Sequence, residues 1–158
     1  MYQRPRDGWE QVILRFPDAV GDIEECNKCF ALARYAAAVF HSLQAVEVGL
    51  IELGRIIVVN DPLPGWTATT QRLKTIIKAK YADMTAFQQQ HKALLEQLDA
   101  TAEALKSSWR NKVSHVHGKM VLMTSDFAPE VAEEILVASR GFMRRLATEA
   151  PTCPDPDA

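Results

Sequence analysis

The sequence predicts an all-α protein, built as an antiparallel bundle of four main helices with a short helix in front of them. Apolar residues recur at helical spacing in long segments, turn formers separate those segments, and no strand pattern of comparable strength appears. The chain has 158 residues, the size of one ordinary domain, and a composition of 47% hydrophobic and 24% charged residues is typical of a globular protein.

The first expected elements cover residues 1–59. Residues 9–16 have the spacing of a brief amphipathic helix that Pro17 ends, and residues 1–22 form an arm that packs on the main body or on a partner subunit. One long helix then runs from about Asp22 to Val59, apolar around much of its circumference and therefore central. Its apolar stripes comprise Phe30, Ala33, Ala37, Phe40, Val39, Leu43, Val46, Leu50 and Leu53, while small residues such as Gly49 and Gly54 permit close approach of another helix.

The remaining elements follow a clear break at residues 60–65, which contain two prolines. Thr67 or Thr69 caps a short helix that runs to about Tyr81 and turns Leu73, Ile76 and Ile77 inward. A third helix is expected from about Thr85 to Val116, where Gly118 supplies a stop, and a last helix from Pro129 to the residue before Pro151. The bundle therefore occupies residues 23–150, and residues 151–158 form a disordered tail.

The cysteine content and the hydropathy limit the classes of protein to which the chain can belong. Cys26 and Cys29 have the spacing of a ligand pair, but a second pair is missing, so they are interpreted as reduced thiols. No metal and no cofactor are expected. The longest apolar stretch, residues 31–57, is interrupted by charged residues, and the N-terminus lacks the apolar region of a secretory signal. A cytoplasmic protein without a membrane partner is the expectation.

One segment, residues 106–119, gathers the residues that could carry chemistry. The chain has a net charge of −2, but no carboxylate stands between Glu103 and Asp126, so this segment is locally positive and suits a phosphate. A guanidinium holds phosphate oxygens in a planar fork, and an imidazole transfers protons near neutral pH, so Arg110 with a histidine could run phosphoryl chemistry without a metal. In the alternative interpretation, these residues only cap carbonyls near the end of a long helix. The polar and basic residues concerned are Arg110, Asn111, Lys112, Ser114, His115, His117 and Lys119.

Glu47 is the anomaly of the long apolar helix. It falls in line with Phe40, Leu43 and Leu50, where burying a carboxylate is costly unless a cation or a hydrogen-bond donor meets it. Arg110 or a histidine of the positive segment is the expected partner. The sequence is equally consistent with two interpretations of Glu47: a salt bridge in the core, or a role in the site.

Three stretches resemble one family. Residues 109–115 resemble the R-x4–6-H signature of HEPN domains, in its common form Arg-Asn-x-x-x-His. Residues 29–50 look like the long first helix of a bacterial branch of that family, and residues 140–147 are similar to its last helix. The resemblance covers residues 23–150, most of the chain.

The resemblance implies a dimerising helical bundle in which two Arg-Asn-His segments meet at a composite cleft. Many HEPN proteins are metal-independent endoribonucleases of toxin–antitoxin, phage-defence and CRISPR-associated systems, whereas others are inactive scaffolds or nucleotide-binding modules. RNA, a second copy of the chain and a cognate antitoxin are the implied partners. Arg110 would bind the scissile phosphate, His115 would transfer a proton to or from a ribose or leaving oxygen, and Asn111 would orient either group. Supporting roles would fall to Glu47, Ser114 and His117, and phosphate binding to Lys112 and Lys119.

Helix geometry qualifies this mapping. Asn111 and His115 are four residues apart and share a face, whereas Arg110 and His115 lie roughly 140° apart on an ideal helix. Those two converge only if the helix loosens before Gly118 or if a partner subunit completes the site. His117 shares the face of Arg110 more directly and could substitute for His115. Histidine phosphotransfer is disfavoured, because that family places Lys before Gly and this chain has the reverse order.

Overall fold

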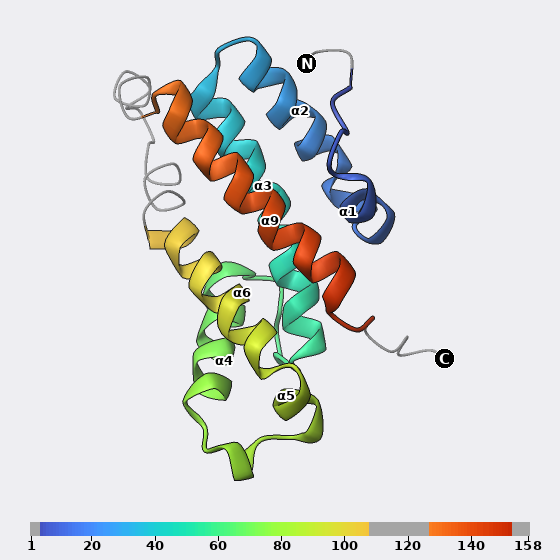
Figure 1. Ribbon diagram of the computed structural model, residues 1–158, viewed down its shortest axis with the longest axis vertical. Helices are drawn as coiled ribbons and strands as arrows, with labels where there is room; N and C mark the ends of the chain where they lie inside the picture. Colours follow the sequence, from blue (N-terminus) through green and yellow to red (C-terminus); the bar gives the residue numbers. More distant parts are fainter. Residues whose placement is uncertain (1–3, 108–126, 153–158) are drawn as a thin grey trace.

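The computed structural model describes residues 4–107 and 127–152, and within these ranges the chain is helical and contains no strand (Figure 1). The all-α class is confirmed, whereas the antiparallel four-helix arrangement is not, because the two ranges contain seven α-helices. They are α1 (Glu10–Arg15), α2 (Val20–Ala31), α3 (Tyr35–Ile56), α4 (Trp66–Lys78), α5 (Ala86–Gln90), α6 (Lys92–Leu105) and α9 (Pro129–Glu149). Single 3-10 turns occupy Pro17–Ala19 and Tyr81–Asp83.

The expected long helix from Asp22 to Val59 is wrong, because the chain turns back after Ala31 and forms a hairpin of α2 and α3 (Figure 1). The backbone N–H of Arg34 donates to the Cys29 carbonyl at 2.8 Å, and that of Ala33 donates to the Phe30 carbonyl at 3.0 Å. This is the hydrogen-bond pattern of a Schellman motif, which requires a left-handed residue after the helix. Ala33 takes that role with a φ of 56°, so no glycine marks the turn in the sequence.

Helix α3 lies at the centre of the fold, between α2 and α9 (Figure 1). It runs parallel to α9, since Ser139 Oγ lies 3.5 Å from Ser42 Oγ and, two turns on, Gly49 faces Met143 and Leu146. A Cβ atom on Gly49 would lie only 3.1 Å from Leu146 Cδ2. The expectation that glycine admits a neighbouring helix is therefore confirmed.

By length and composition alone, α3 could also cross a membrane. Half of its most apolar window is buried inside the fold. Packing in the core accounts for its composition, as the expected apolar stripe indicates: Val39, Leu43, Val46, Leu50 and Leu53 are all buried. Phe40, which was expected in the other stripe, is exposed, and the earlier members of that stripe lie elsewhere: Phe30 on α2 and Ala33 in the turn.

Helix α4 begins one residue after Gly65, so the expected threonine cap is wrong. Thr69 is instead buried and donates its hydroxyl to the Leu50 carbonyl at 2.8 Å, which ties α4 to α3. Leu73 and Ile76 are buried as expected, and Ile77 packs partly against the core.

The third expected helix starts where predicted but is interrupted. Thr85 and Gln88 form a capping box in front of α5, and His91, with a φ of −105°, separates α5 from α6. The core residues Leu94, Leu98, Ala102 and Leu105 are buried, as the apolar spacing predicted. The expected continuation to Val116 lies outside the described residues.

The N-terminal and C-terminal helices pack on each other. Trp9, Val12 and Phe16 belong to the core, and the Arg15 guanidinium donates to carbonyl oxygens of the last turn of α9 and beyond. Of the two expectations for the N-terminal residues, packing on the main body is the one observed. Helix α9 begins at Pro129 as predicted, and the C-terminal tail from residue 153 lies outside the described ranges.

Candidate functional site

Glu47 is the single expected site residue within the described ranges. The others lie outside residues 4–107 and 127–152, and they are Arg110, Asn111, Lys112, Ser114, His115, His117 and Lys119. The structure therefore describes the helices that flank the positive segment in the chain, α6 before it and α9 after it, and the helices packed against these two.

Glu47 lies on α3, partly buried, beside the start of α4. A Cβ atom built on Gly65 would stand 3.0 Å from Glu47 Cγ and 3.3 Å from Glu47 Oε1. Gly65 is the N-cap of α4, and its missing side chain leaves room for the carboxylate at the positive end of the helix dipole. That position gives a physical reason for an acid on an apolar helix, independent of the expected pairing with Arg110.

The end of α6 packs against α4, the helix whose N-cap lies beside Glu47. Lys74 Nζ lies 3.0 Å from Glu103 Oε2, and Lys106 Nζ donates to Thr70 Oγ1 at 3.4 Å, so α4 and α6 run antiparallel. The first residue of the positive segment thus lies beside the second turn of α4, whose N-cap touches Glu47. A series of contacts therefore leads from α3 to the start of that segment. Glu47 contacts Gly65 at the N-cap of α4, and Thr70 on the same helix contacts Lys106.

Two carboxylates on α6 stand just before this point. Burial raises the pKa of Asp99, the charge of Glu103 adds to that effect, and Lys74 opposes it. Among the described residues, neither Asp99 Oδ1 nor Glu103 Oε1 has a hydrogen-bond partner. Lys106 Nζ lies 4.0 Å from Glu103 Oε1, which is too long for a hydrogen bond. Both carboxylates precede the positive segment in the chain, Glu103 by three residues.

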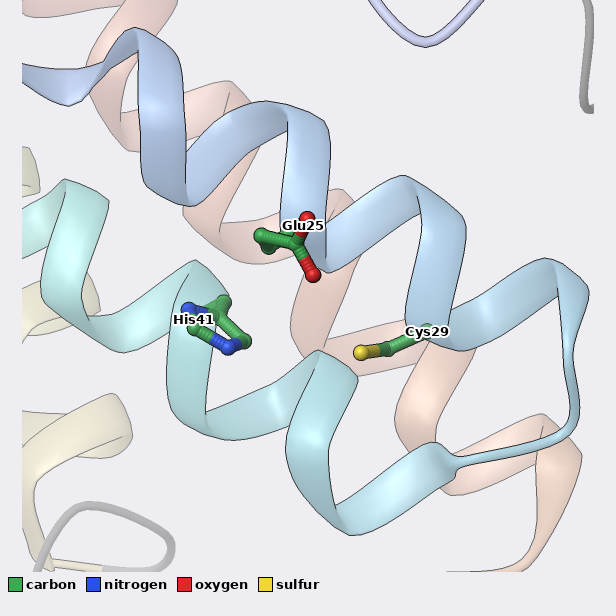
Figure 2. Close-up of side chains that lie close together, drawn as sticks. All are labelled: Glu25, Cys29 and His41. Carbon is green, nitrogen blue, oxygen red and sulfur yellow. The ribbon is translucent and has the colours of Figure 1, made fainter.

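A second group of reactive side chains bridges α2 and α3. A carboxylate oxygen of Glu25, the thiol sulfur of Cys29 and a ring nitrogen of His41 all lie within 4.8 Å of one another (Figure 2). Glu25 and Cys29 are one helical turn apart and share a face of α2, while His41 comes from α3. His41 Nδ1 also lies 2.8 Å from Asp22 Oδ1.

Sequence reasoning missed this group because it treated α2 and α3 as one helix. Glu25 and His41 are sixteen residues apart, which on a continuous helix is about 24 Å. The turn at Ala33 brings them together. The spacing Glu25-x-x-x-Cys29 was the one local signal present in the sequence.

Cys26 does not belong to this group. Both Cys26 and Cys29 are reduced and buried, as expected for thiols without a disulfide partner. Burial raises the pKa of Cys26 to about 12, with smaller contributions from Cys29 and Asp22. Its thiolate, the form that binds metals, is therefore strongly disfavoured.

A pocket of about 500 Å³ opens between the N-terminal residues, α2 and α9. Its lining includes two guanidinium groups, from Arg4 and Arg140, and two carboxylates, from Asp7 and Glu133. Aromatic and apolar side chains also line it, from Trp9, Phe30 and Leu136. The volume is sufficient for a small organic ligand.

No protein-family model matches the sequence, and no curated protein and no solved structure shows a significant match. The HEPN resemblance stays a prediction from the motif.

Proposed function

We propose that the chain is a metal-independent endoribonuclease of HEPN type, which cleaves RNA at a cleft between two copies of itself. The observation that carries the proposal is the run Arg110-Asn111-x-x-x-His115 in a carboxylate-free segment, between α6 and the last helix of an all-α fold. In this proposal α2, α3, α6 and α9 correspond to the four helices of the HEPN bundle, and residues 29–50, which were expected to match its long first helix, are instead divided between α2 and α3 by the turn at Ala33. The four helices alternate in direction along the chain, and α4 and α5 are an insertion (Figure 1).

The proposed reaction needs only a guanidinium and imidazoles. His115 removes the proton of the ribose 2′-hydroxyl, and the 2′-oxygen attacks phosphorus while Arg110 binds the non-bridging oxygens and stabilises their growing charge. The bond from phosphorus to the 5′-oxygen breaks, leaving a 2′,3′-cyclic phosphate. A second imidazole, from His117 or from the partner subunit, gives a proton to the departing 5′-oxygen. Asn111 orients the histidine or the phosphate, and Lys112 and Lys119 bind neighbouring phosphates.

The surroundings of Glu47 support this proposal. Its carboxylate lies at the N-terminus of α4, and Lys106 reaches Thr70 on the same helix. A carboxylate so near the entry to the positive segment can pair with one of the cations there and fix its orientation. Glu47→Gln keeps the shape of the side chain and removes its charge, so reduced cleavage by a stably folded Glu47→Gln variant supports this role.

The direct test is cleavage of a labelled single-stranded RNA by purified protein in the presence of a chelator. His115→Ala is expected to lower the rate at least ~100-fold, the usual contribution of a general acid or base. His91→Ala, which changes a histidine at the junction of α5 and α6, is the matched control and is expected to cleave as the parent does. Equal cleavage by the parent and by a His115→Ala, His117→Ala double variant would mean a contaminating nuclease and would overturn the proposal.

The shared cleft has its own test. Subunits carrying Arg110→Ala and subunits carrying His115→Ala are inactive separately, but a mixed dimer retains one intact site if Arg110 of one copy works with His115 of the other. Recovered cleavage on mixing therefore supports a composite site. A protein that cleaves RNA as a monomer in light scattering would exclude it.

A second candidate function, a non-catalytic nucleotide-binding module, is favoured by the pocket between α2 and α9. Arg4 and Arg140 could hold phosphates beside the aromatic side chains of Trp9 and Phe30. Calorimetric titration with ATP and GMP tests it: Arg140→Ala is expected to weaken binding at least tenfold. Arg145→Ala, on the same helix but paired with Glu149, is expected to have no effect.

A further inference from the structure

We propose that Glu25, Cys29 and His41 bind a divalent transition-metal ion such as Zn²⁺ between α2 and α3, with Asp22 as the residue that positions His41. This inference concerns a different part of the molecule from the positive segment and does not rest on the proposed ribonuclease function.

The three donor atoms are already gathered. They lie within 4.8 Å of one another, and Figure 2 shows the three side chains converging from the facing sides of the two helices. In tetrahedral zinc sites, metal–ligand lengths of 2.0–2.3 Å put ligand atoms about 3.5 Å apart. The half-exposed Glu25 side chain can rotate and so contribute to the closer approach that a bound metal requires.

The contact with Asp22 prepares His41 for metal binding. With Nδ1–H donated to Asp22 Oδ1 at 2.8 Å, the lone pair is left on Nε2. Histidines that ligate metals commonly donate their other ring N–H to a carboxylate in this manner, which fixes the tautomer and raises the basicity of the ligand. The Phe40 ring lies edge-on to the imidazole, with centroids 5.3 Å apart, and further restricts its rotation.

The donor set selects the class of metal. One thiolate, one imidazole and one carboxylate suit Zn²⁺ or Co²⁺, whereas Mg²⁺ and Ca²⁺ require oxygen ligands throughout. The Cys29 thiol loses its proton to solvent when the metal binds. Cys29 is only 7% exposed, while Glu25 and His41 are partly exposed, so the metal would enter from their side. A water molecule completes the fourth position.

In the metal-free protein, Lys28 Nζ lies 3.1 Å from Glu25 Oε1. This exposed ion pair is weak, so a metal that takes the Glu25 carboxylate displaces little binding energy. The bound metal would cross-link α2 to α3 and hold closed the hairpin that the Ala33 turn forms. Loss of the metal would therefore weaken the contact between α2 and α3.

The test uses the full chain with Cys153→Ser, so that Cys26 and Cys29 are the remaining thiols. Titration of the metal-free protein with Co²⁺ is expected to give a thiolate-to-cobalt charge-transfer band at one equivalent, and Zn²⁺ is expected to remove it by displacement. Cys29→Ser should abolish the band, and His41→Gln should weaken Zn²⁺ binding at least tenfold. Asp22→Asn is expected to weaken it 10–100-fold, about the usual effect of losing an outer carboxylate. His91→Gln, outside the group, is the matched control and should bind as the parent does.

Stability gives an independent readout. Zn²⁺ is expected to raise the melting temperature of the parent but not that of Cys29→Ser, and Mg²⁺ should change neither. If His41→Gln does not fold by circular dichroism, Glu25→Gln, which changes a partly exposed side chain, replaces it with the same expected weakening. Absence of the charge-transfer band in the folded parent, or a band that persists in Cys29→Ser, would overturn the proposal. Because binding and melting are measured without RNA, failure here is separate from failure of the ribonuclease assay.

Discussion

Ala33→Gly gives the sharpest test of the fold, because two arrangements of the same residues predict opposite signs. In the structure Ala33 is exposed and left-handed, with a φ of 56°, between α2 and α3. In a continuous helix across residues 22–59, the same residue would have ordinary helical angles.

The magnitude follows from backbone energetics. A left-handed conformation costs an L-residue about 1–2 kcal/mol, and glycine avoids this cost. Glycine also loses about 0.5–1 kcal/mol more conformational entropy on folding than alanine. The net expectation for Ala33→Gly is a gain of about 0.5–1 kcal/mol in the free energy of unfolding. In a continuous helix the substitution would instead lose about 1 kcal/mol.

Urea denaturation followed by circular dichroism measures the difference as a shift of the midpoint at unchanged slope. Ala100→Gly, at an exposed position inside α6, is the matched control and should lower stability by about 1 kcal/mol. Two variants that are destabilised equally would refute the left-handed turn, and with it the closeness of Glu25 to His41.

Three further outcomes are expected. Arg15→Ala should lower the free energy of unfolding by about 1–3 kcal/mol in urea denaturation, because the last carbonyls of α9 lose their donor, whereas an unchanged midpoint would place that guanidinium in solvent. Burial raises the pKa of Asp99, so its ionised form destabilises the fold above the ordinary aspartate pKa and the penalty disappears on acidification. Asp99→Asn should therefore raise the melting temperature at pH 7 but not at pH 3; a gain independent of pH would contradict this. Cys26, with its pKa near 12, should react with a thiol reagent far more slowly in the native protein than in urea, and rapid native labelling would contradict its burial.

The apolar pattern was sufficient to predict the class of the fold and most of its core. Leu43, Leu50, Leu98 and Phe142 are buried as their helical spacing indicated, and Pro129 starts the last helix, because a buried stripe leaves a regular trace in the sequence.

The turns were harder to predict, because their residues do not have the usual identity. Ala33 and the β-branched Val58 both adopt left-handed angles after helices, where glycine would have given a signal. The cap of α4 was wrong for a related reason: Thr69 has the chemistry of a cap, but its hydroxyl is used in a contact with α3.

The site was predictable only in part. The motif around Arg110 is local and could be recognised from a single stretch of sequence. Glu47 was singled out as an acid on an apolar helix, but its place beside Gly65 depends on how α4 packs on α3. The Glu25–Cys29–His41 group depends on the turn at Ala33. Because that turn was not predicted, the closeness of the three side chains was not predicted either.

The Arg15 contacts make the two ends of the protein depend on each other. A deletion of residues 4–16 would remove Trp9, Val12 and Phe16 from the core and also uncap the final helix, although the rest of the sequence would be untouched. An N-terminally shortened protein made for crystallisation would then aggregate because its C-terminal helix has lost its cap, although the cut lies at the N-terminus.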